Sequence, residues 1–234
     1  MHGQSPRILI AAPQAVPEML LVLFDVDGTL LLSHDPLVGE AMAQVARELG
    51  VEVDVSRLAP GETALRQGRE IGVLEPDLPR WCVGVGERYL ELLAGADTSG
   101  WRAPDGVAAT LAEVAGVGKL ALLTGNPEPM ARARMERLGL ARFFRRGEGA
   151  FGCDAEERPR LIELARQRAG GWPAGETVAV GDTPRDVEGA HAAGVRVVAV
   201  ESHRFGAEAL AGADARISSL SSLPEALSSL RPSG

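Results

Sequence analysis

An alternation of short apolar runs with amphipathic segments, along the second half of the chain, constrains the fold more than any other feature of the sequence. The apolar runs, at 119–123, 177–180 and 195–200, have the length of strands that are buried on both faces. Around them, apolar residues recur three and four positions apart, which predicts helices at 106–115, 128–138, 156–168, 184–193 and 222–230. Strands and helices that alternate in this way are typical of an α/β fold, in which helices cover both faces of a parallel sheet.

The first apolar run, 20–24, is separated from this alternation by a long helical stretch. From 36 to 93 the apolar residues keep the helical spacing, and no strand signal of comparable strength interrupts them. A loop rich in Gly, Asp, Ser and Pro follows at 94–106. We therefore predict a dispensable N-terminal extension at residues 1–18. The core is expected to consist of two segments, 19–33 and 104–234, with a helical insertion, 34–103, between them.

Composition and charge exclude several classes of partner. The 234 residues are 45% hydrophobic and only 4% aromatic, so Ala, Val and Leu must build the core. The net charge is −8, and Lys and Arg form no basic stripe, which argues against nucleic acid and anionic membranes as partners. A small soluble partner fits this composition, and we expect a monomer or a homodimer.

The cysteines and the N-terminus bear on the cellular compartment. Cys82 and Cys153 lie far apart in the sequence and belong to no CxxC or metal-ligand motif, which favours reduced, buried thiols. The longest apolar run is far shorter than the roughly 18 residues of a membrane span, and the N-terminus lacks the charged-then-apolar pattern of a signal peptide. We therefore expect a cytoplasmic protein without membrane contact.

The positions directly after three of the predicted strands carry polar groups suited to chemistry. In open parallel sheets, ligands bind beyond the carboxyl ends of the strands, so these positions are expected to lie together. The residues concerned, from the segments after 20–24, 119–123 and 177–180, are Asp25, Asp27, Thr124, Gly125, Asn126, Asp182 and Asp186. The three strands thus bring several carboxylates and one hydroxyl to one edge of the sheet.

Carboxylates gathered at one edge repel each other unless a cation holds them. Oxygen ligands without Cys or His favour Mg²⁺. With such an ion to offset the repulsion from an anionic phosphate, Asp25 could attack phosphorus and form an aspartyl-phosphate. Asp27, which the flexible Gly28 turns in another direction, would act as general acid and base. Thr124 and nearby backbone N–H groups would hold the phosphoryl oxygens.

Each of these motifs also has a purely structural explanation when it is taken alone. DxDGT could be a turn with an Asx cap, LLTGN a helix cap, and GDTPRD an acidic loop. The three occur in this order, each at the end of a predicted strand, and this combination favours a catalytic site.

From about residue 20 onward, the sequence resembles the haloacid dehalogenase superfamily of hydrolases. DVDGT resembles the first motif of that family, ALLTGN the second, and GDTPRDVEGAHAAG the fourth. The resemblance implies a Rossmann-like three-layer core. The helical insertion is similar to the cap of the phosphoglycolate-phosphatase-like branch, a small α-helical domain that closes over the substrate. The implied roles are nucleophile for Asp25, acid/base for Asp27, metal ligand for Asp25, Asp182 and the backbone carbonyl of Asp27, metal support for Asp186, and phosphate binding for Thr124, Gly125 and Asn126.

At the third motif, this sequence departs from the usual pattern of the family. It normally carries a lysine ahead of the metal loop, but the single lysine here, Lys119, begins a strand, at the wrong end for catalysis. The expected place holds EERPR, so Arg158 is the substitute that we predict, because a guanidinium bears a permanent charge and binds two phosphate oxygens at once. The alternative is that Arg158 is an ordinary helix-start residue and that another group, such as Arg160, supplies the charge.

Residues of the helical insertion are expected to choose the substrate. Arg66, Arg69 and Arg88 are the candidates that could reach an anionic leaving group, although such arginines often stay solvated on their own helix. Related caps often carry Gly-Arg-Thr early on, where this chain has Gly-Glu-Thr at 61–63, which argues against phosphoglycolate as the substrate. His34 is expected to be a surface loop residue near the entrance.

The sequence as a whole predicts a Mg²⁺-dependent phosphatase that acts on a small phosphorylated metabolite. Two alternatives remain. A phosphomutase of the β-phosphoglucomutase type would keep both aspartates and the helical cap. A non-catalytic protein that binds a phosphorylated metabolite would need no acid/base, so the presence of both Asp25 and Asp27 argues against it.

Overall fold

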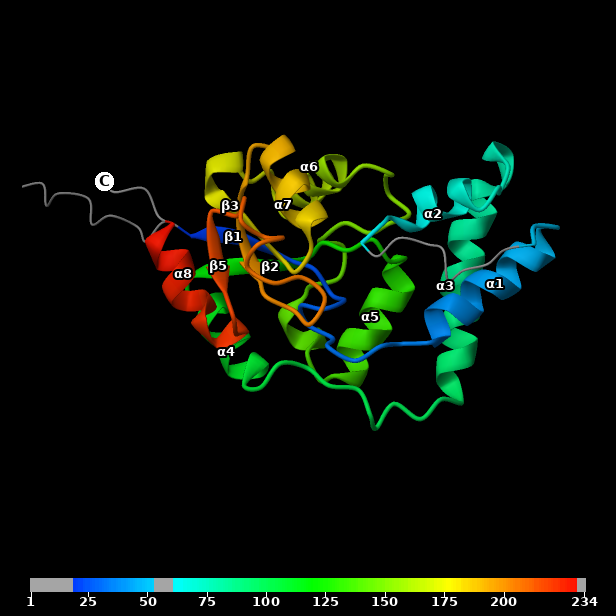
Figure 1. Ribbon diagram of the computed structural model, residues 1–234, viewed down its shortest axis with the longest axis horizontal. Coiled ribbons are helices and arrows are strands. Elements are labelled where there is room, and N and C mark those ends of the chain that lie inside the picture. The colour runs from blue at the N-terminus through cyan, green and yellow to red at the C-terminus, as the bar shows by residue number, and fades with distance from the viewer. Residues whose placement is uncertain (1–18, 53–60, 231–234) are drawn as a thin grey trace, which may run out of the picture.

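The structure is a computed structural model that describes residues 19–52 and 61–230 (Figure 1). The predicted extension, 1–18, lies outside the described residues. Figure 1 shows two parts, a sheet flanked by helices and a separate group of helices beside it. None of the described helices is long and apolar enough to pass through a lipid bilayer.

The part of the chain that the structure describes forms one parallel sheet in the strand order β2-β1-β3-β4-β5. The strands are β1 (Leu20–Phe24), β2 (Gly118–Leu122), β3 (Thr177–Gly181), β4 (Arg196–Val200) and β5 (Ala215–Ile217). The predicted α/β fold is confirmed, and β1 to β4 match the apolar runs closely. The sequence analysis missed β5, because three residues are too few to show a period. Pairing with β4, with Val198 opposite Ala215, makes this segment a strand at the edge of the sheet.

The helices follow one another along the chain in the order that the periodicity predicts, and α1, α2 and α3 lie apart from the sheet. The α-helices are α1 (Leu37–Glu48), α2 (Ala64–Glu70), α3 (Leu78–Ala94), α4 (Val107–Ala115), α5 (Glu128–Arg137), α6 (Arg158–Arg168), α7 (Pro184–Ala192) and α8 (Leu223–Ser229). Short 3₁₀ helices are η2 (Glu75–Asp77), η3 (Ala141–Phe143), η4 (Ala174–Glu176) and η5 (Leu220–Ser222). Proline stands in the first turn of α5, α6 and α7, where a missing N–H breaks no helical hydrogen bond.

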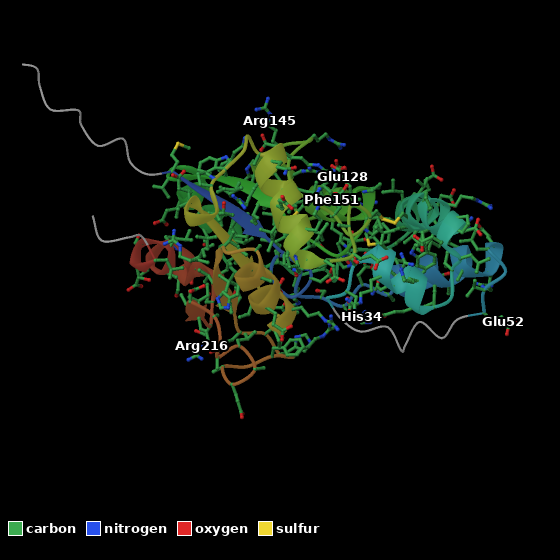
Figure 2. The ribbon with its side chains drawn as sticks, turned by 90° about the horizontal axis from the view of Figure 1, so that it is seen from above. His34, Glu52, Glu128, Arg145, Phe151 and Arg216 are labelled. Carbon is green, nitrogen blue, oxygen red and sulfur yellow. A yellow bond between two sulfur atoms is a disulfide. The ribbon has the colours of Figure 1, made fainter. Side chains whose placement is uncertain are left out.

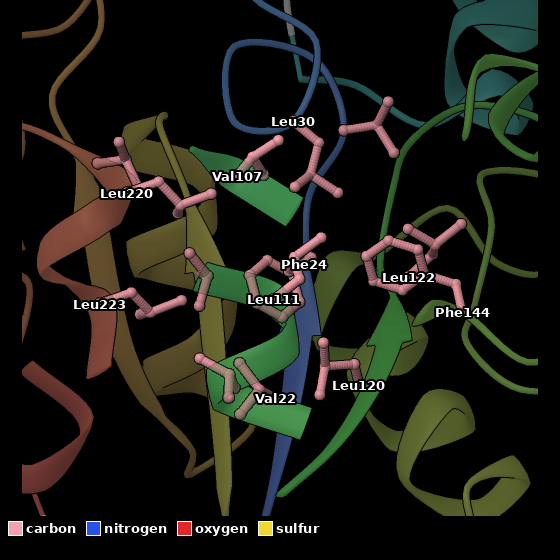
Figure 3. Packing of buried hydrophobic residues seen from close by; sticks show 14 of the residues in the cluster. Val22, Phe24, Leu30, Val107, Leu111, Leu120, Leu122, Phe144, Leu220 and Leu223 are labelled. Atoms are coloured by element: carbon pink, nitrogen blue, oxygen red, sulfur yellow. The ribbon is translucent and has the colours of Figure 1, made fainter. Parts of the chain in front are cut away.

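Two hydrophobic cores lie on opposite faces of the sheet, because successive strand residues point in opposite directions. One core joins Val22 and Phe24 of β1 to Leu111 of α4 (Figure 3). The other joins Leu21 of β1 to Leu161 of α6. Full burial of a leucine is worth about 1.5–3 kcal/mol, so the two cores fix the strands and hold their carboxyl ends in register. The result is the three-layer arrangement that the site depends on.

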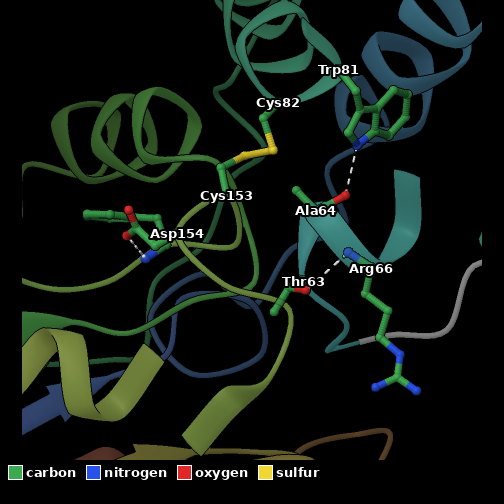
Figure 4. Close-up of a disulfide and its surroundings, with 8 residues drawn as sticks. Thr63, Ala64, Arg66, Trp81, Cys82, Cys153 and Asp154 are labelled. Carbon is green, nitrogen blue, oxygen red and sulfur yellow. Dashed lines mark hydrogen bonds between the residues drawn. A yellow bond between two sulfur atoms is a disulfide. The ribbon is translucent and has the colours of Figure 1, made fainter. Parts of the chain in front are cut away.

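Helices α1, α2 and α3, which we call the helical block (residues 37–94), pack in a further hydrophobic cluster, which also includes Met130 and Ala133 of α5. Trp81 and Tyr89 of α3 are fully buried in it. The indole N–H of Trp81 donates to the backbone carbonyl of Ala64 at 2.8 Å and so ties α3 to α2 (Figure 4). A Cβ at Gly68 would lie 2.6 Å from the Trp81 ring, so only glycine lets α2 approach the indole this closely.

A disulfide joins the helical block to the rest of the molecule. Cys82 of α3 and Cys153, in the loop before α6, form the bond, with their Cα atoms 5.7 Å apart (Figure 4). The prediction of reduced thiols was therefore wrong. Neither cysteine belongs to a recognisable motif, and the two meet only because the helical block packs on the core, which their spacing in the sequence does not reveal. A disulfide is also more usual in an oxidising compartment than in the cytoplasm.

Candidate active site

The carboxyl end of β1 places Asp25 and Asp27 in different surroundings. The backbone N–H of Asp25 donates to Val180 of the neighbouring strand β3, and its side chain is buried. The side chain of Asp27, two residues later, is about half exposed (47%) and lines a cavity. Gly28 makes the turn between strand and loop with a φ of +82°. A Cβ at this position would lie 2.1 Å from Asp182 Oδ2, so the turn requires glycine on two grounds.

Three buried carboxylates meet at this edge. Each of Asp25, Asp182 and Asp186 offers an oxygen within 4.8 Å of the others. Burial raises the pKa of Asp25 well above its usual value, against the opposing effect of Arg158. Burial, together with the charges of Asp186 and Asp27, raises the pKa of Asp182 to about 6. These shifts show that the carboxylates of Asp25 and Asp182 are poorly solvated and are repelled by their acidic neighbours when charged.

The donor set fits a hard divalent cation. Asp182 Oδ1 is buried and has no hydrogen-bond partner among the described residues, which leaves one carboxylate oxygen available. Oxygen ligands without Cys or His suit Mg²⁺. Both oxygens of Asp186 have protein partners: Oδ2 accepts from the backbone N–H of Thr183 at 3.0 Å and from its hydroxyl at 2.7 Å, and Oδ1 pairs with Arg158. Asp186 is therefore placed to hold the loop more than to act as a free ligand.

Arg158 turns inward, at the motif where the sequence departs from the pattern of the superfamily that it resembles. Its guanidinium is buried and donates to Asp25 Oδ1 at 3.1 Å, and it also pairs with Asp186. A Cβ on Gly189 of α7 would lie 2.8 Å from the Arg158 stem, so this glycine gives the side chain its path. The alternative residue, Arg160, instead pairs with Glu163 on the exposed side of α6.

The single lysine does not contribute to this edge. Lys119 donates to the carbonyl of Ala169 at 2.7 Å and pairs with Glu148 at 2.7 Å, near the start of β2. Arg158 is thus the cation nearest to the Asp25 carboxylate in the residues that the structure describes.

The segment after β2 supplies the polar groups opposite Asp27. Thr124 is buried directly beyond the strand. Its hydroxyl oxygen accepts from the backbone N–H of Asn126 at 3.3 Å and from the Asn126 amide at 3.1 Å. The same amide donates to Asp27 Oδ2. Gly125 is needed here because a Cβ would lie 2.3 Å from the carbonyl of Glu62.

One site residue escaped the sequence analysis altogether. Arg134 of α5 is completely buried, and its Nη1 lies 3.0 Å from both carboxylate oxygens of Asp27. Its Nη2 donates to Asp35 at 2.9 Å. The segment ARARMER carries three arginines in six positions, and nothing in its composition marks the middle one as the residue that points inward. Arg132, by contrast, binds backbone carbonyls on the other side of the helix, including that of Phe144 at 2.8 Å.

These groups surround a cavity of about 300 Å³ between the sheet edge and the helical block. Asp25, Asp27 and Asp182 line the sheet side, and Glu62 and Gln67 line the other. The loop after β4 adds His203 and Arg204. His34 is exposed in the loop between the two parts of the molecule and also lines the cavity, in agreement with the expected surface residue near the entrance (Figure 2).

The start of α2 is bonded directly to the core and closes one side of the cavity. The backbone N–H groups of Ala64 and Leu65 donate to the carbonyls of Gly125 at 2.8 Å and Gly152 at 3.0 Å. A Cβ on Gly152 would collide with the Gly125 carbonyl, so glycine permits this close approach. Glu62 pairs with Arg185 of α7 across the same boundary.

The three arginines proposed to reach the substrate do not line the described cavity. Arg66 pairs with Glu70 at 3.3 Å and Glu157 at 3.4 Å, and Arg69 pairs with Glu156 and Glu75. Arg88 contacts Glu48, at 2.8 Å, within the helical block. The contact of these arginines with the substrate stays a prediction, since helical periodicity gives the face of a residue but not the acidic neighbours that tertiary packing places on that face.

Comparison with known proteins places these features in a family. The model of the haloacid dehalogenase-like hydrolases matches residues 19–194. A phosphoglycolate phosphatase from Xylella fastidiosa is 31% identical over 182 residues, which cover 74% of this chain and 76% of the relative. The tyrosine-protein kinase PtkA from Mycobacterium tuberculosis is 31% identical over 195 residues, 77% of this chain and 61% of that protein.

Solved structures share the whole fold at low sequence identity. A β-phosphoglucomutase from Clostridium difficile superimposes with a TM-score of 0.66 at 16% identity, covering 91% of this chain and 97% of that one. CbbY from Rhodobacter sphaeroides, solved with phosphate, has a TM-score of 0.64 at 21% identity, with 88% and 96% covered. At such identities the likeness establishes the fold and not the reaction.

Proposed function

Because the chain belongs to the haloacid dehalogenase-like hydrolase family, we propose that it is a Mg²⁺-dependent phosphatase that hydrolyses a small organic phosphomonoester through an aspartyl-phosphate. The observation that carries the proposal is the buried group of Asp25, Asp182 and Asp186 beside Arg158 at the edge of the cavity. Carboxylates brought out of water next to each other cost stability, which argues for a role beyond folding.

In the first step, a carboxylate oxygen of Asp25 attacks phosphorus, and the bond from phosphorus to the leaving oxygen breaks. Asp27 gives its proton to that oxygen, which leaves as an alcohol. Thr124, with the backbone N–H groups of Gly125 and Asn126, binds the phosphoryl oxygens. Arg158 favours the charged form of Asp25 before attack and offsets the negative charge of the intermediate afterwards.

In the second step, a water molecule attacks the phosphorus of the aspartyl-phosphate. Asp27, now a carboxylate, takes the proton from this water, and the bond between phosphorus and Asp25 breaks. Phosphate leaves, and both aspartates return to their initial forms. The half-exposed position of Asp27 on the cavity wall suits a group that must meet both the leaving alcohol and the water.

The residues that would hold Mg²⁺ are Asp25, Asp182 and the backbone carbonyl of Asp27, with Asp186 in support. When bound, the ion offsets the repulsion between a carboxylate and an anionic phosphoryl group. The unpartnered Oδ1 of Asp182, in the described part of the chain, supports this assignment.

The helical block would act as the cap, residues 34–103, over a core made of 19–33 and 104–234. A cavity of about 300 Å³ suits a small phosphorylated metabolite. The phosphatase relative from Xylella fastidiosa makes phosphoglycolate a natural first substrate to test, and the Gly-Glu-Thr sequence at 61–63 makes a different ester our expectation.

Phosphate release from a panel of phosphomonoesters, with Mg²⁺ and with chelator, tests the reaction. We expect metal-dependent release by the wild type and a loss on the order of 10⁴ or more in Asp25→Asn, since removal of a catalytic nucleophile has effects of this size. Acid-quenched samples should carry the phosphoryl group on the peptide that contains Asp25. Transfer to a second sugar hydroxyl without net release would favour a phosphomutase, and binding without either reaction would favour a non-catalytic protein.

A further inference from the structure

We propose that Arg134 is a positioning residue that aims the carboxyl group of Asp27 and that Tyr89 of the helical block holds Arg134 in place, an inference that rests on the proposed function. Arg134 is completely buried on α5, far in sequence from both partners. Its Nη1 lies 3.0 Å from each carboxylate oxygen of Asp27. This charge-assisted contact, end-on to both oxygens, holds the carboxyl group in position.

The other side of the guanidinium is held by two buried groups. Asp35 Oδ2 accepts from Arg134 Nη2 at 2.9 Å and from Nε at 3.1 Å. The Tyr89 hydroxyl donates to the same Asp35 oxygen at 2.7 Å and accepts from Arg134 Nε at 3.2 Å. The guanidinium carbon also lies 5.4 Å from the centre of the Tyr89 ring, a cation–π distance. Asp35 and Tyr89 therefore fix the arginine head from one side and leave Nη1 to face Asp27.

One cation, Arg134, faces two carboxylates in this network, the half-exposed one of Asp27 and the buried one of Asp35. Burial disfavours the charged form of Arg134, but Asp27, Tyr89 and Asp35 more than offset this, so the pKa of Arg134 is raised. A buried cation with partners on both sides cannot move to water at low cost, and it therefore gives the more exposed Asp27 a fixed reference point. The amide of Asn126 supplies the only other side-chain contact to Asp27 in the described residues.

The network crosses from the core to the helical block. Asp27 and Arg134 belong to the core, Asp35 begins the connection to the block, and Tyr89 lies in α3. When the block packs on the core as it does here, Tyr89 and Asp35 complete the seat of Arg134, and Arg134 in turn aims Asp27. The position of the acid/base is thus coupled to the docking of the helices that enclose the substrate.

The dependence of the rate on the leaving group tests this role. Asp27 must protonate an alkyl alcohol as it leaves, whereas p-nitrophenolate leaves without a proton. A misplaced Asp27 should therefore lower kcat/KM for an alkyl phosphomonoester much more than for p-nitrophenyl phosphate, because kcat/KM reports the first phosphoryl transfer. A change that only loosens the fold should lower both equally.

Arg134→Lys is the informative variant. A lysine keeps the charge but lacks the fork, so it should stay with the buried Asp35 and release Asp27. We expect kcat/KM for the best alkyl ester of the panel to fall about 10- to 100-fold, a part of the 10²–10⁴ that acid–base catalysis supplies. For p-nitrophenyl phosphate we expect less than about a threefold change. Arg132→Lys, a second buried arginine of the same helix that binds backbone carbonyls, is the matched control and should not separate the two esters.

Tyr89→Phe keeps the experiment decisive if Arg134→Lys fails to fold. It removes the hydroxyl that holds Asp35 and Arg134 and keeps the ring, so the same selective loss should appear with a smaller size. Equal losses for both esters in the folded variants, or none, would overturn the positioning role. A wild type that hydrolyses neither ester, with Asp25→Asn unchanged from it, would instead refute the proposed function itself.

Discussion

Charged side chains are buried at the carboxyl edge of the sheet, whereas the charged pairs of the helical block are exposed to solvent. At the edge, Asp25 and Arg158 are only 7% and 8% exposed to solvent, and they contact each other directly. In the helical block, the side chains of Arg66 and Arg69 keep 39% and 49% of their exposure while they pair with glutamates. Buried charges are expensive and are kept where chemistry needs them, whereas exposed pairs contribute little. The contrast predicts that substitutions at the edge act on turnover and those on the exposed faces of the block do not.

Arg158 should show the largest effect of this comparison. Arg158→Met removes the cation beside the nucleophile, and we expect kcat to fall by about 10²–10³, as for loss of one electrostatic stabiliser of a transition state. Arg158→Lys restores the residue type usual in the family and should keep more of the activity. Steady-state kinetics at saturating Mg²⁺ measure both, because the ion limits the repulsion that the lost cation leaves behind.

Arg160→Met is the matched control for this prediction. It lies two residues further along α6, on the exposed side, and pairs with Glu163. It should change kcat by less than about twofold, in keeping with the small worth of surface pairs. If Arg160→Met were the more damaging variant, the charge at the third motif would have been assigned to the wrong arginine.

Reduction of the disulfide should have the next largest effect, which should appear in the stability of the protein. The bond joins the block to the core at Cys82 and Cys153, which are 71 positions apart. Closing a loop of this length restricts the unfolded chain, and reduction should lower the free energy of unfolding by about 2–4 kcal/mol. Denaturant unfolding with and without a reductant measures this difference.

Cys82→Ala/Cys153→Ala supplies the control for the reductant. This double variant should unfold like the reduced wild type and should not respond to reductant. If protein denatured without reductant showed two reactive thiols per chain, the disulfide would be contradicted. Cys82 and Cys153 would then be reduced, as the sequence analysis predicted.

The sequence predicted the sheet edge well because each site motif follows a strong apolar run. Asp25, Thr124 and Asp182 each stand within two residues of the end of such a run, and a parallel sheet brings those ends together. Arg158 was found for a related reason, since its position relative to the metal loop could be compared with a family pattern. The positions of the motifs relative to the predicted strands were therefore enough to place these groups together.

The contacts between block and core could not be predicted in the same way. Arg134 looks like its neighbours in ARARMER, and only the packing of α5 against Tyr89 and Asp35 makes it a buried partner of Asp27. The disulfide depends on the same docking. β5 was missed because its three residues become a strand only when β4 offers an edge. Each of these features is a product of long-range contacts that have no local periodicity.

The smallest effect is expected where the sequence analysis placed substrate-binding arginines. Arg66→Ala removes pairs with Glu70 and Glu157 that are exposed to solvent, and should change the free energy of unfolding by less than about 0.5 kcal/mol and kcat/KM by less than about twofold. Arg88→Ala is the control, since its charged partners, Glu48 and Glu91, lie within the block. A tenfold rise in KM for Arg66→Ala alone would mean that this arginine reaches the substrate when the block moves. Catalysis would then not be confined to the carboxyl edge of the sheet, because Arg66, the residue of the helical block that pairs with Glu157 of the core, would also bind substrate.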